Sequence, residues 1–153
     1  MISAEQGAAG RAVHEVVVQG SAAGFAQEVV AGSHHFKSDE PLSEGGTDTG
    51  PSPYDFLLAA LGSCTSMTVA MYARRKGWPL DRVAVHLRHN KIYAQDCADC
   101  ETREGMLDQI ERDIRFSGSL SAEQRAKLME IADKCPVHRT LTSEIKIRTR
   151  EIE

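Results

Sequence analysis

The stretch that decides the fold is SPYDFLLAALGSCTSMTVAMYARRKG, residues 52–77. It opens with Ser52 and Pro53, which are signals of a helix start. Serine caps free backbone N–H groups, and proline suits the first helical position. It ends with three cations and a glycine, and Pro79 follows shortly, a pattern typical of a helix C-terminus. These signals predict one long helix.

This helix is apolar on nearly every side. Its first part, FLLAAL at residues 56–61, has no polar position, and the serines and threonines that follow are uncharged. Such a helix buries several faces, so we expect it in the middle of the molecule, covered by a sheet or a second subunit. The apolar run over residues 56–72 is shorter than the roughly 20 residues that span a bilayer.

Short strands are predicted before the helix. Residues 13–19 and 25–31 are rich in valine or other apolar residues, and the turn-like GSAAG segment between them predicts a hairpin. A third strand is expected at residues 34–36. Prolines, glycines and small polar residues predict a loop over residues 41–52. Residues 1–12 have no apolar period, and we expect a flexible N-terminus there.

Strands and short helices are predicted after the long helix. Residues 83–88 alternate between apolar and polar, which favours a strand. Residues 106–116 fit either a helix or a strand. A capping box predicts a helix over residues 121–134, and a further short helix is expected to begin in residues 135–138. Alternation over residues 145–149 predicts a final strand.

Composition indicates one globular domain over residues 13–153. The chain has 153 residues, of which 41% are hydrophobic and 26% charged, as in ordinary folded proteins. The formal net charge of −4 lacks the basic excess of nucleic-acid binders, so no nucleic-acid or membrane partner is expected. No signal-peptide pattern opens the chain, and we expect a cytoplasmic protein.

The cysteines are Cys64, Cys97, Cys100 and Cys135. In a cytoplasmic protein they are more often reduced, catalytic or metal-bound than paired in structural disulfides. Cys64, near the centre of the long helix, is either a small buried hydrophobe or a nucleophile at the floor of a pocket. Cys135 precedes Pro136 at a predicted helix start, where it is either a capping residue or a thiolate stabilised by backbone N–H groups.

Cys97-Ala98-Asp99-Cys100 lies among acidic residues. The pair could belong to an exposed structural loop, act as an accessory redox dithiol, or supply half of a zinc site. The structural loop is preferred, because acidic neighbours disfavour a thiolate and no second pair follows at zinc spacing. Among the histidines, His34 and His35 are expected on a short strand, one facing each way, and His86 and His89 are expected to face solvent.

Two of these segments resemble the OsmC/Ohr family. PSPYDFLLAALGSC, residues 51–64, is similar to the helix that carries the family's first cysteine. CPVHRTL, residues 135–141, is similar to the segment that carries its second cysteine. Their order and separation also fit, and the resemblance covers roughly residues 13–150. It is closest to the less characterised OsmC-like branch.

The resemblance implies an α+β fold, built as an intertwined homodimer with two central long helices wrapped by antiparallel sheets. It implies thiol-dependent reduction of organic hydroperoxides in oxidative-stress defence, by a cysteine-based peroxidase with no bound cofactor or metal. Cys64 would attack the peroxide and become a sulfenic acid, and Cys135 would condense with it to a disulfide. An external dithiol, which is a lipoylated protein for Ohr proteins, would restore both thiols.

The sequence departs from the family at the groups that activate the thiolate. Fast family members use an arginine from the first hairpin, held by a glutamate near the start of the cysteine helix. Residues 13–37 contain no arginine here, and Tyr54 stands at the glutamate position. Lys37 and Arg139 are candidate substitutes. The alternative function is a non-catalytic OsmC-like module that binds a small molecule or senses thiols, and a zinc protein built on Cys97 and Cys100 is a more distant third.

The two assignments of the reactive thiol disagree. Local electrostatics favours Cys135 as the more acidic cysteine, because of its predicted place at a helix start. The resemblance favours Cys64 as the residue that attacks the peroxide. We follow the family assignment, since activating groups can come from parts of the chain that sequence spacing does not reveal.

Overall fold

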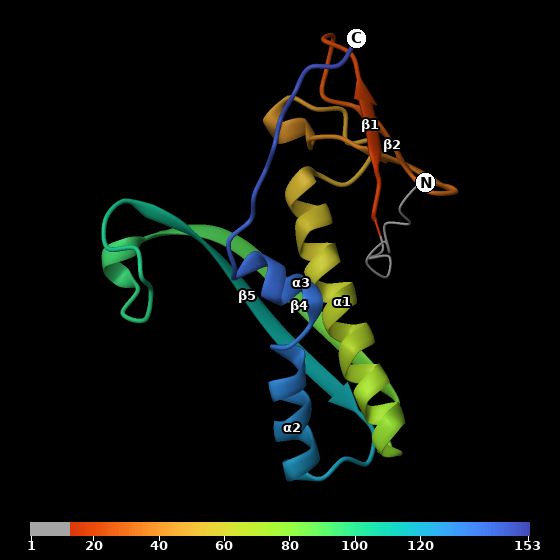
Figure 1. Ribbon diagram of the computed structural model, residues 1–153, viewed down its shortest axis with the longest axis vertical. Helices are drawn as coiled ribbons and strands as arrows, with labels where there is room; N and C mark the ends of the chain where they lie inside the picture. Colours follow the sequence, from red (N-terminus) through yellow and green to blue (C-terminus); the bar gives the residue numbers. More distant parts are fainter. Residues whose placement is uncertain (1–12) are drawn as a thin grey trace, which may run out of the picture. The chain divides into compact units, whose positions relative to one another are not determined.

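The computed structural model describes residues 13–153 (Figure 1). The expected flexible N-terminus, residues 1–12, lies outside the described residues. The chain divides into two compact units, one ending at Pro53 and the other running from Tyr54 to Glu153. Antiparallel sheets occur in both units together with helices, so the α+β class is confirmed.

The first unit is built on a three-stranded antiparallel sheet in the order β1 (Val17–Gly20), β2 (Gln27–Ala31) and β3 (His34–Ser38). Val29 of β2, which is buried, lies opposite Phe36 of β3. The predicted hairpin and third strand are thus confirmed, although β1 begins later than expected. A short 3-10 helix, η1 (Leu42–Glu44), lies in the predicted loop.

Asp39 organises the loop after β3. Its buried carboxylate accepts hydrogen bonds from the hydroxyls of Thr47 at 2.6 Å and Thr49 at 2.7 Å, and from the Thr49 backbone N–H at 3.1 Å. The bonds from Thr47 and Thr49 stabilise the charged form and hold the pKa of Asp39 well below its usual range. The glycine- and proline-rich loop therefore has a polar centre of its own.

The predicted long helix is α1 (Pro53–Lys76), and Gly77 ends it with φ 65°, in the left-handed region. Its buried residues include Leu61, Thr65, Val69 and Ala73, one every fourth position and hence on one face. Met67 on another face is 70% exposed, so this chain buries one face of α1, and cover of the other faces by a second subunit stays a prediction. By length and composition alone α1 could cross a membrane, but core helices also meet that test.

The packed face of α1 belongs to a core built with a long hairpin and a second helix (Figure 1). β4 (Arg82–Tyr93) pairs with β5 (Met106–Ser117), so the ambiguous segment is a strand. A 3-10 helix, η2 (Ala94–Asp96), follows β4. α2 (Ala122–Ala132) begins at the predicted capping box. The core residues are Val69, Ala73, Phe116, Leu128, Ile131 and Ala132.

The C-terminal segment departs from its prediction. α3 (Pro136–Leu141) is the expected short helix, but residues 144–153 have no regular structure, so the strand predicted over residues 145–149 is wrong. Ile145 and Ile147 are 53% and 80% exposed. A strand needs partners for its backbone N–H and C=O groups, and none of the described strands pairs with this segment.

Candidate redox site

Cys135 stands at the start of α3 and is completely buried. The short helix begins there because Pro136 fixes the backbone of the first helical position. The Cys135 sulfur, as the N-cap group, accepts a hydrogen bond from the His138 backbone N–H at 3.3 Å. The two interpretations of Cys135 are therefore compatible. The residue caps the helix, and the capping hydrogen bond favours a thiolate.

Thr65 of α1 approaches Cys135 from a position 70 residues away in the sequence. Its buried hydroxyl lies 3.7 Å from the Cys135 sulfur and 2.7 Å from the Leu61 carbonyl, to which it donates. Cys64, the preceding residue of α1, is half-buried and free. Hydrogen bonding from Cys64 is one of the influences on the pKa of Cys135, so the structure brings the two predicted cysteines together.

The pKa of Cys135 lies below its ordinary value. Burial disfavours a charged sulfur and raises the pKa, but other influences lower it by more. These are hydrogen bonds from the His138 N–H and from the side chains of Thr65 and Cys64, and the positive charge of Arg112. The expectation that local electrostatics makes Cys135 acidic is confirmed, but a side chain outside α3 contributes a charge that the sequence did not predict.

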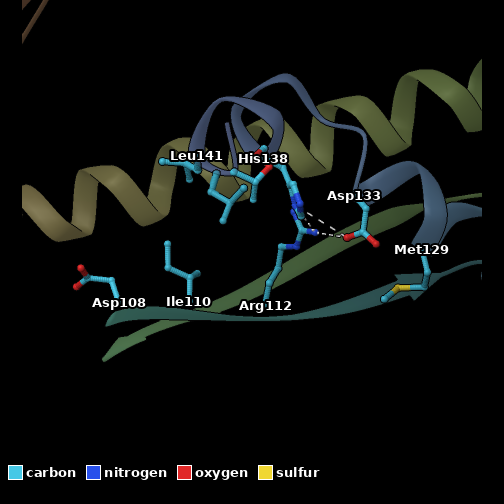
Figure 2. A pocket seen from close by; sticks show the side chains of 9 residues that line it. Asp108, Ile110, Arg112, Met129, Asp133, His138 and Leu141 are labelled. Atoms are coloured by element: carbon cyan, nitrogen blue, oxygen red, sulfur yellow. Dashed lines mark hydrogen bonds and ion pairs between the residues drawn. The ribbon is translucent and has the colours of Figure 1, made fainter. Parts of the chain in front are cut away.

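Arg112 of β5 is the cation of this site (Figure 2). Its Nη1 donates to the Thr65 hydroxyl oxygen at 2.9 Å, and its Nη2 donates to Asp133 at 2.7 Å. The same Nη2 lies 3.1 Å from His138 Nδ1, which must accept because a guanidinium has only donors. The side chain is 11% exposed, so these partners hold it in one position.

The candidate substitutes Lys37 and Arg139 have other surroundings within their own parts of the chain. Lys37 forms an ion pair with Glu28 at 3.4 Å within the first unit. Arg139 is exposed on α3. Neither contributes to the pKa of Cys135, whereas Arg112 does.

A cavity of about 360 Å³ is lined by residues of α1, β5, α2 and α3 (Figure 2). Neither thiol is among its lining residues, but Arg112 lines it and is bonded to Thr65, which connects the cavity to Cys135. Its wall is mixed, with apolar side chains beside charged ones. The lining residues are Leu61, Asp108, Ile110, Arg112, Met129, Asp133, His138, Leu141 and Thr142.

The second cysteine pair forms a disulfide between Cys97 and Cys100, in the loop that joins β4 to β5. The expectation of reduced cysteines is wrong for this pair, because the two intervening residues leave their Cα atoms 5.4 Å apart, within disulfide range. The ligand atoms of Cys97, Asp99 and Cys100 lie within 4.8 Å of one another and could hold a metal ion if the pair were reduced. A structural zinc site takes four ligands, and this group offers three.

His89 does not face solvent, and that expectation is wrong. Its ring stacks on Tyr54 of α1 with centroids 4.3 Å apart, and its Nε2 lies 2.8 Å from an Asp108 oxygen. The side chain is 14% exposed as a result. Tyr54, at the family's glutamate position, therefore packs on β4 and contacts no cysteine in any interaction found among the described residues. His34, His35 and His86 are exposed.

Helices combined with antiparallel sheets, and two thiols supplied by different helices, define a small α+β protein with a paired-cysteine site. A family model for OsmC-like proteins matches residues 46–150, which is more than half of the chain. The chain belongs to the OsmC-like family. A comparison with curated proteins gives no match.

Solved structures share the fold at low sequence identity. An organic hydroperoxide resistance protein OsmC from Legionella pneumophila is 15% identical, with TM-score 0.64 over 88% of this chain and 92% of that one. OhrB of Bacillus subtilis is 17% identical, with TM-score 0.58 over 85% and 90%. An osmotic stress and detoxification response protein from Psychrobacter arcticus 273-4 is 17% identical, with TM-score 0.63 over 86% and 89%.

Proposed function

We propose that this protein reduces organic hydroperoxides with Cys64 and Cys135, as a cytoplasmic enzyme of oxidative-stress defence. The observation that carries the proposal is the meeting of the two thiols beside Arg112, with the pKa of Cys135 below its ordinary value. Fold similarity to proteins described as organic hydroperoxide resistance proteins supports the same substrate class.

The reaction begins at Cys64, because it is half-buried while Cys135 is completely buried. The Cys64 thiolate attacks the distal peroxide oxygen, the O–O bond breaks, and the alkoxide takes up a proton and leaves as an alcohol. The Cys135 thiolate then attacks the sulfur of the Cys64 sulfenic acid, hydroxide leaves as water after protonation, and a disulfide forms. An external dithiol restores the two thiols by exchange.

The neighbouring cavity suits the organic part of such a substrate. Leu61, Ile110 and Leu141 give it apolar wall, and Arg112 and His138 give it polar groups at one side. A cavity of about 360 Å³ accommodates a small hydroperoxide.

The active form is a homodimer. On α1, Met67 and Met71 are 70% and 43% exposed, although the helix is apolar. The C-terminal residues Ile145 and Ile147 are also exposed and belong to a segment with strand-like alternation that pairs with none of the described strands. A second copy that packs on Met67 and Met71 and pairs with this segment, and leaves the approach to Cys64 open, would bury both features.

The test is peroxide consumption with cumene hydroperoxide and dithiothreitol. The native protein is expected to turn over, and Cys64→Ser and Cys135→Ser each to lose at least about 90% of the rate, because either change removes a sulfur that the cycle needs. Equal rates for the three proteins would refute the proposal. The absence of a hairpin arginine favours the second candidate, a non-catalytic binding or thiol-sensing module, which would instead show saturable ligand binding without turnover.

A further inference from the structure

We propose that the external reductant attacks Cys64 of the Cys64–Cys135 disulfide and that Cys135 leaves as the thiolate. Thr65 and Arg112 are the positioning residues that stabilise the negative charge of this thiolate. The inference rests on the proposed function, since it concerns the disulfide that this function creates. It assigns a direction to the reductive half of the cycle and a role to two side chains.

Access separates the two sulfurs. Cys135 has no exposed surface, whereas Cys64 is half-buried. Exchange requires a thiolate to approach one sulfur along the S–S axis, so the nucleophile reaches the accessible sulfur and the buried one becomes the leaving group. The reductant therefore forms its mixed disulfide with Cys64.

The Thr65 hydroxyl is placed to donate a hydrogen bond to the Cys135 thiolate. It has one hydrogen, which it gives to the Leu61 carbonyl, and its oxygen lies 3.7 Å from the Cys135 sulfur. A thiol at Cys135 can donate to this oxygen, but a thiolate has no proton and can only accept. When Cys135 becomes a thiolate, rotation of the Thr65 hydroxyl about its C–O bond turns its hydrogen from the Leu61 carbonyl to the sulfur.

Arg112 supports this arrangement in two ways. It donates to the Thr65 oxygen at 2.9 Å, which polarises the hydroxyl and makes it a stronger donor to sulfur. Its own positive charge also favours the thiolate of Cys135. Asp133 pairs with the other side of the guanidinium, but its side chain is 69% exposed, so solvent weakens its opposing charge at the sulfur.

The exchange balances in two steps. The first thiolate of the external dithiol bonds to the Cys64 sulfur, the S–S bond breaks, and its electron pair goes to Cys135. The second thiol of the reductant loses its proton and attacks the reductant's own sulfur in the mixed disulfide. Cys64 leaves with that electron pair and takes up a proton, and the reductant departs as a disulfide.

The first experiment determines which sulfur is attacked. The disulfide is closed with diamide, the protein is treated briefly with glutathione and quenched with acid, and the peptides are analysed by mass spectrometry. We expect the glutathione adduct on Cys64 and a free thiol at Cys135. An adduct mainly on Cys135 would overturn the proposal, and so would failure of diamide to join these two cysteines.

The second experiment measures the role of the two positioning residues. Thr65→Val and Arg112→Gln are expected to slow reduction of the disulfide about three- to tenfold, and to raise the pKa of Cys135 when its thiolate absorbance is followed in a Cys64→Ser background. Arg112→Lys should recover part of both losses. Arg115→Gln, which removes an exposed arginine of the same strand, is the matched control and should change neither quantity.

Unchanged reduction rates and an unchanged pKa of Cys135 in Thr65→Val and Arg112→Gln would overturn the roles of these side chains. Because diamide closes the disulfide without peroxide, the outcome does not depend on peroxidase activity. A protein that does not consume hydroperoxide but gives the Cys64 adduct would refute the proposed function and leave the direction of exchange supported.

Discussion

The two cysteine pairs of this protein lie in opposite surroundings. Cys64 and Cys135 come from two helices, and the Cys135 sulfur is buried among Thr65, Arg112 and a backbone N–H group. Cys97 and Cys100 are separated by two residues in a loop that includes Asp99, and both are partly exposed. The distant pair is free in the structure and the local pair is closed.

This difference shows that a short spacing and a reactive environment are separate properties. Short spacing makes a disulfide easy to close, because little chain must be ordered to bring the sulfurs together. A stabilised thiolate needs donors and a cation, and the acidic neighbours Asp96, Asp99 and Glu101 disfavour one at Cys97 and Cys100. At Cys64 and Cys135 these groups are held in place by packing. Substitutions in the buried core should therefore lower the free energy of unfolding far more than substitutions near the loop of Cys97 and Cys100.

The largest expected loss of stability comes from a substitution in the buried core. Leu128 of α2 is completely buried in the core, and Leu128→Ala should lower the free energy of unfolding by about 2–5 kcal/mol by leaving a cavity. Met106, at the start of β5 near the disulfide loop, is 52% exposed, and Met106→Ala should cost less than about 1 kcal/mol. Urea unfolding measures the change in the free energy of unfolding for both variants. Similar changes would contradict the expected difference between the core and the region near the disulfide loop.

Local signals in the sequence were enough for much of the fold. The Ser52-Pro53 start and Gly77 end mark α1, and the Ser121–Gln124 capping box marks α2 within a residue or two. These features act over one turn of chain, so they can be read without knowing what packs against them. The same holds for Cys135-Pro136, whose capping geometry follows from two adjacent residues.

The groups that meet at the site could not be predicted in this way. Residues 106–116 fitted a helix as well as a strand, and only the strand places Arg112 on the same face as Ile110 and Ile114. An arginine in an otherwise apolar row is the signal that was missed. The register then sets Arg112 opposite Leu87, so its approach to Thr65 depends on a pairing that spans 25 residues.

A second prediction concerns pH and applies to the reduced protein. Because the folded state lowers the pKa of Cys135, its contribution to stability is present above the pKa of the unfolded thiol and is lost as pH falls through the folded value. The advantage of the native protein over Cys135→Ala in urea unfolding should therefore grow as pH rises through that window. Both proteins carry Cys97→Ser and Cys100→Ser, so that these two cysteines add nothing to the measured difference.

The control for this prediction removes one hydrogen-bond donor while keeping the thiol. Thr65→Val replaces the buried hydroxyl that lies 3.7 Å from the Cys135 sulfur with a methyl group of similar size. In that background the change with pH should become shallower. A stability difference that stays constant across the pH range would mean that the folded and unfolded thiols bind protons equally, and that the surroundings of Cys135 do not favour its thiolate.

The smallest expected effect belongs to the exposed pair. The double change Cys97→Ser and Cys100→Ser should leave hydroperoxide turnover within about twofold, because neither residue lines the cavity and neither contributes to the pKa of Cys135. The disulfide closes a very short loop, so its loss should cost at most about 2 kcal/mol in unfolding experiments. Treatment with EDTA should likewise leave turnover unchanged. A loss of turnover after either treatment would mean that the loop acts in the cycle, either by exchanging disulfides with the buried pair or by holding a metal ion at Cys97, Asp99 and Cys100.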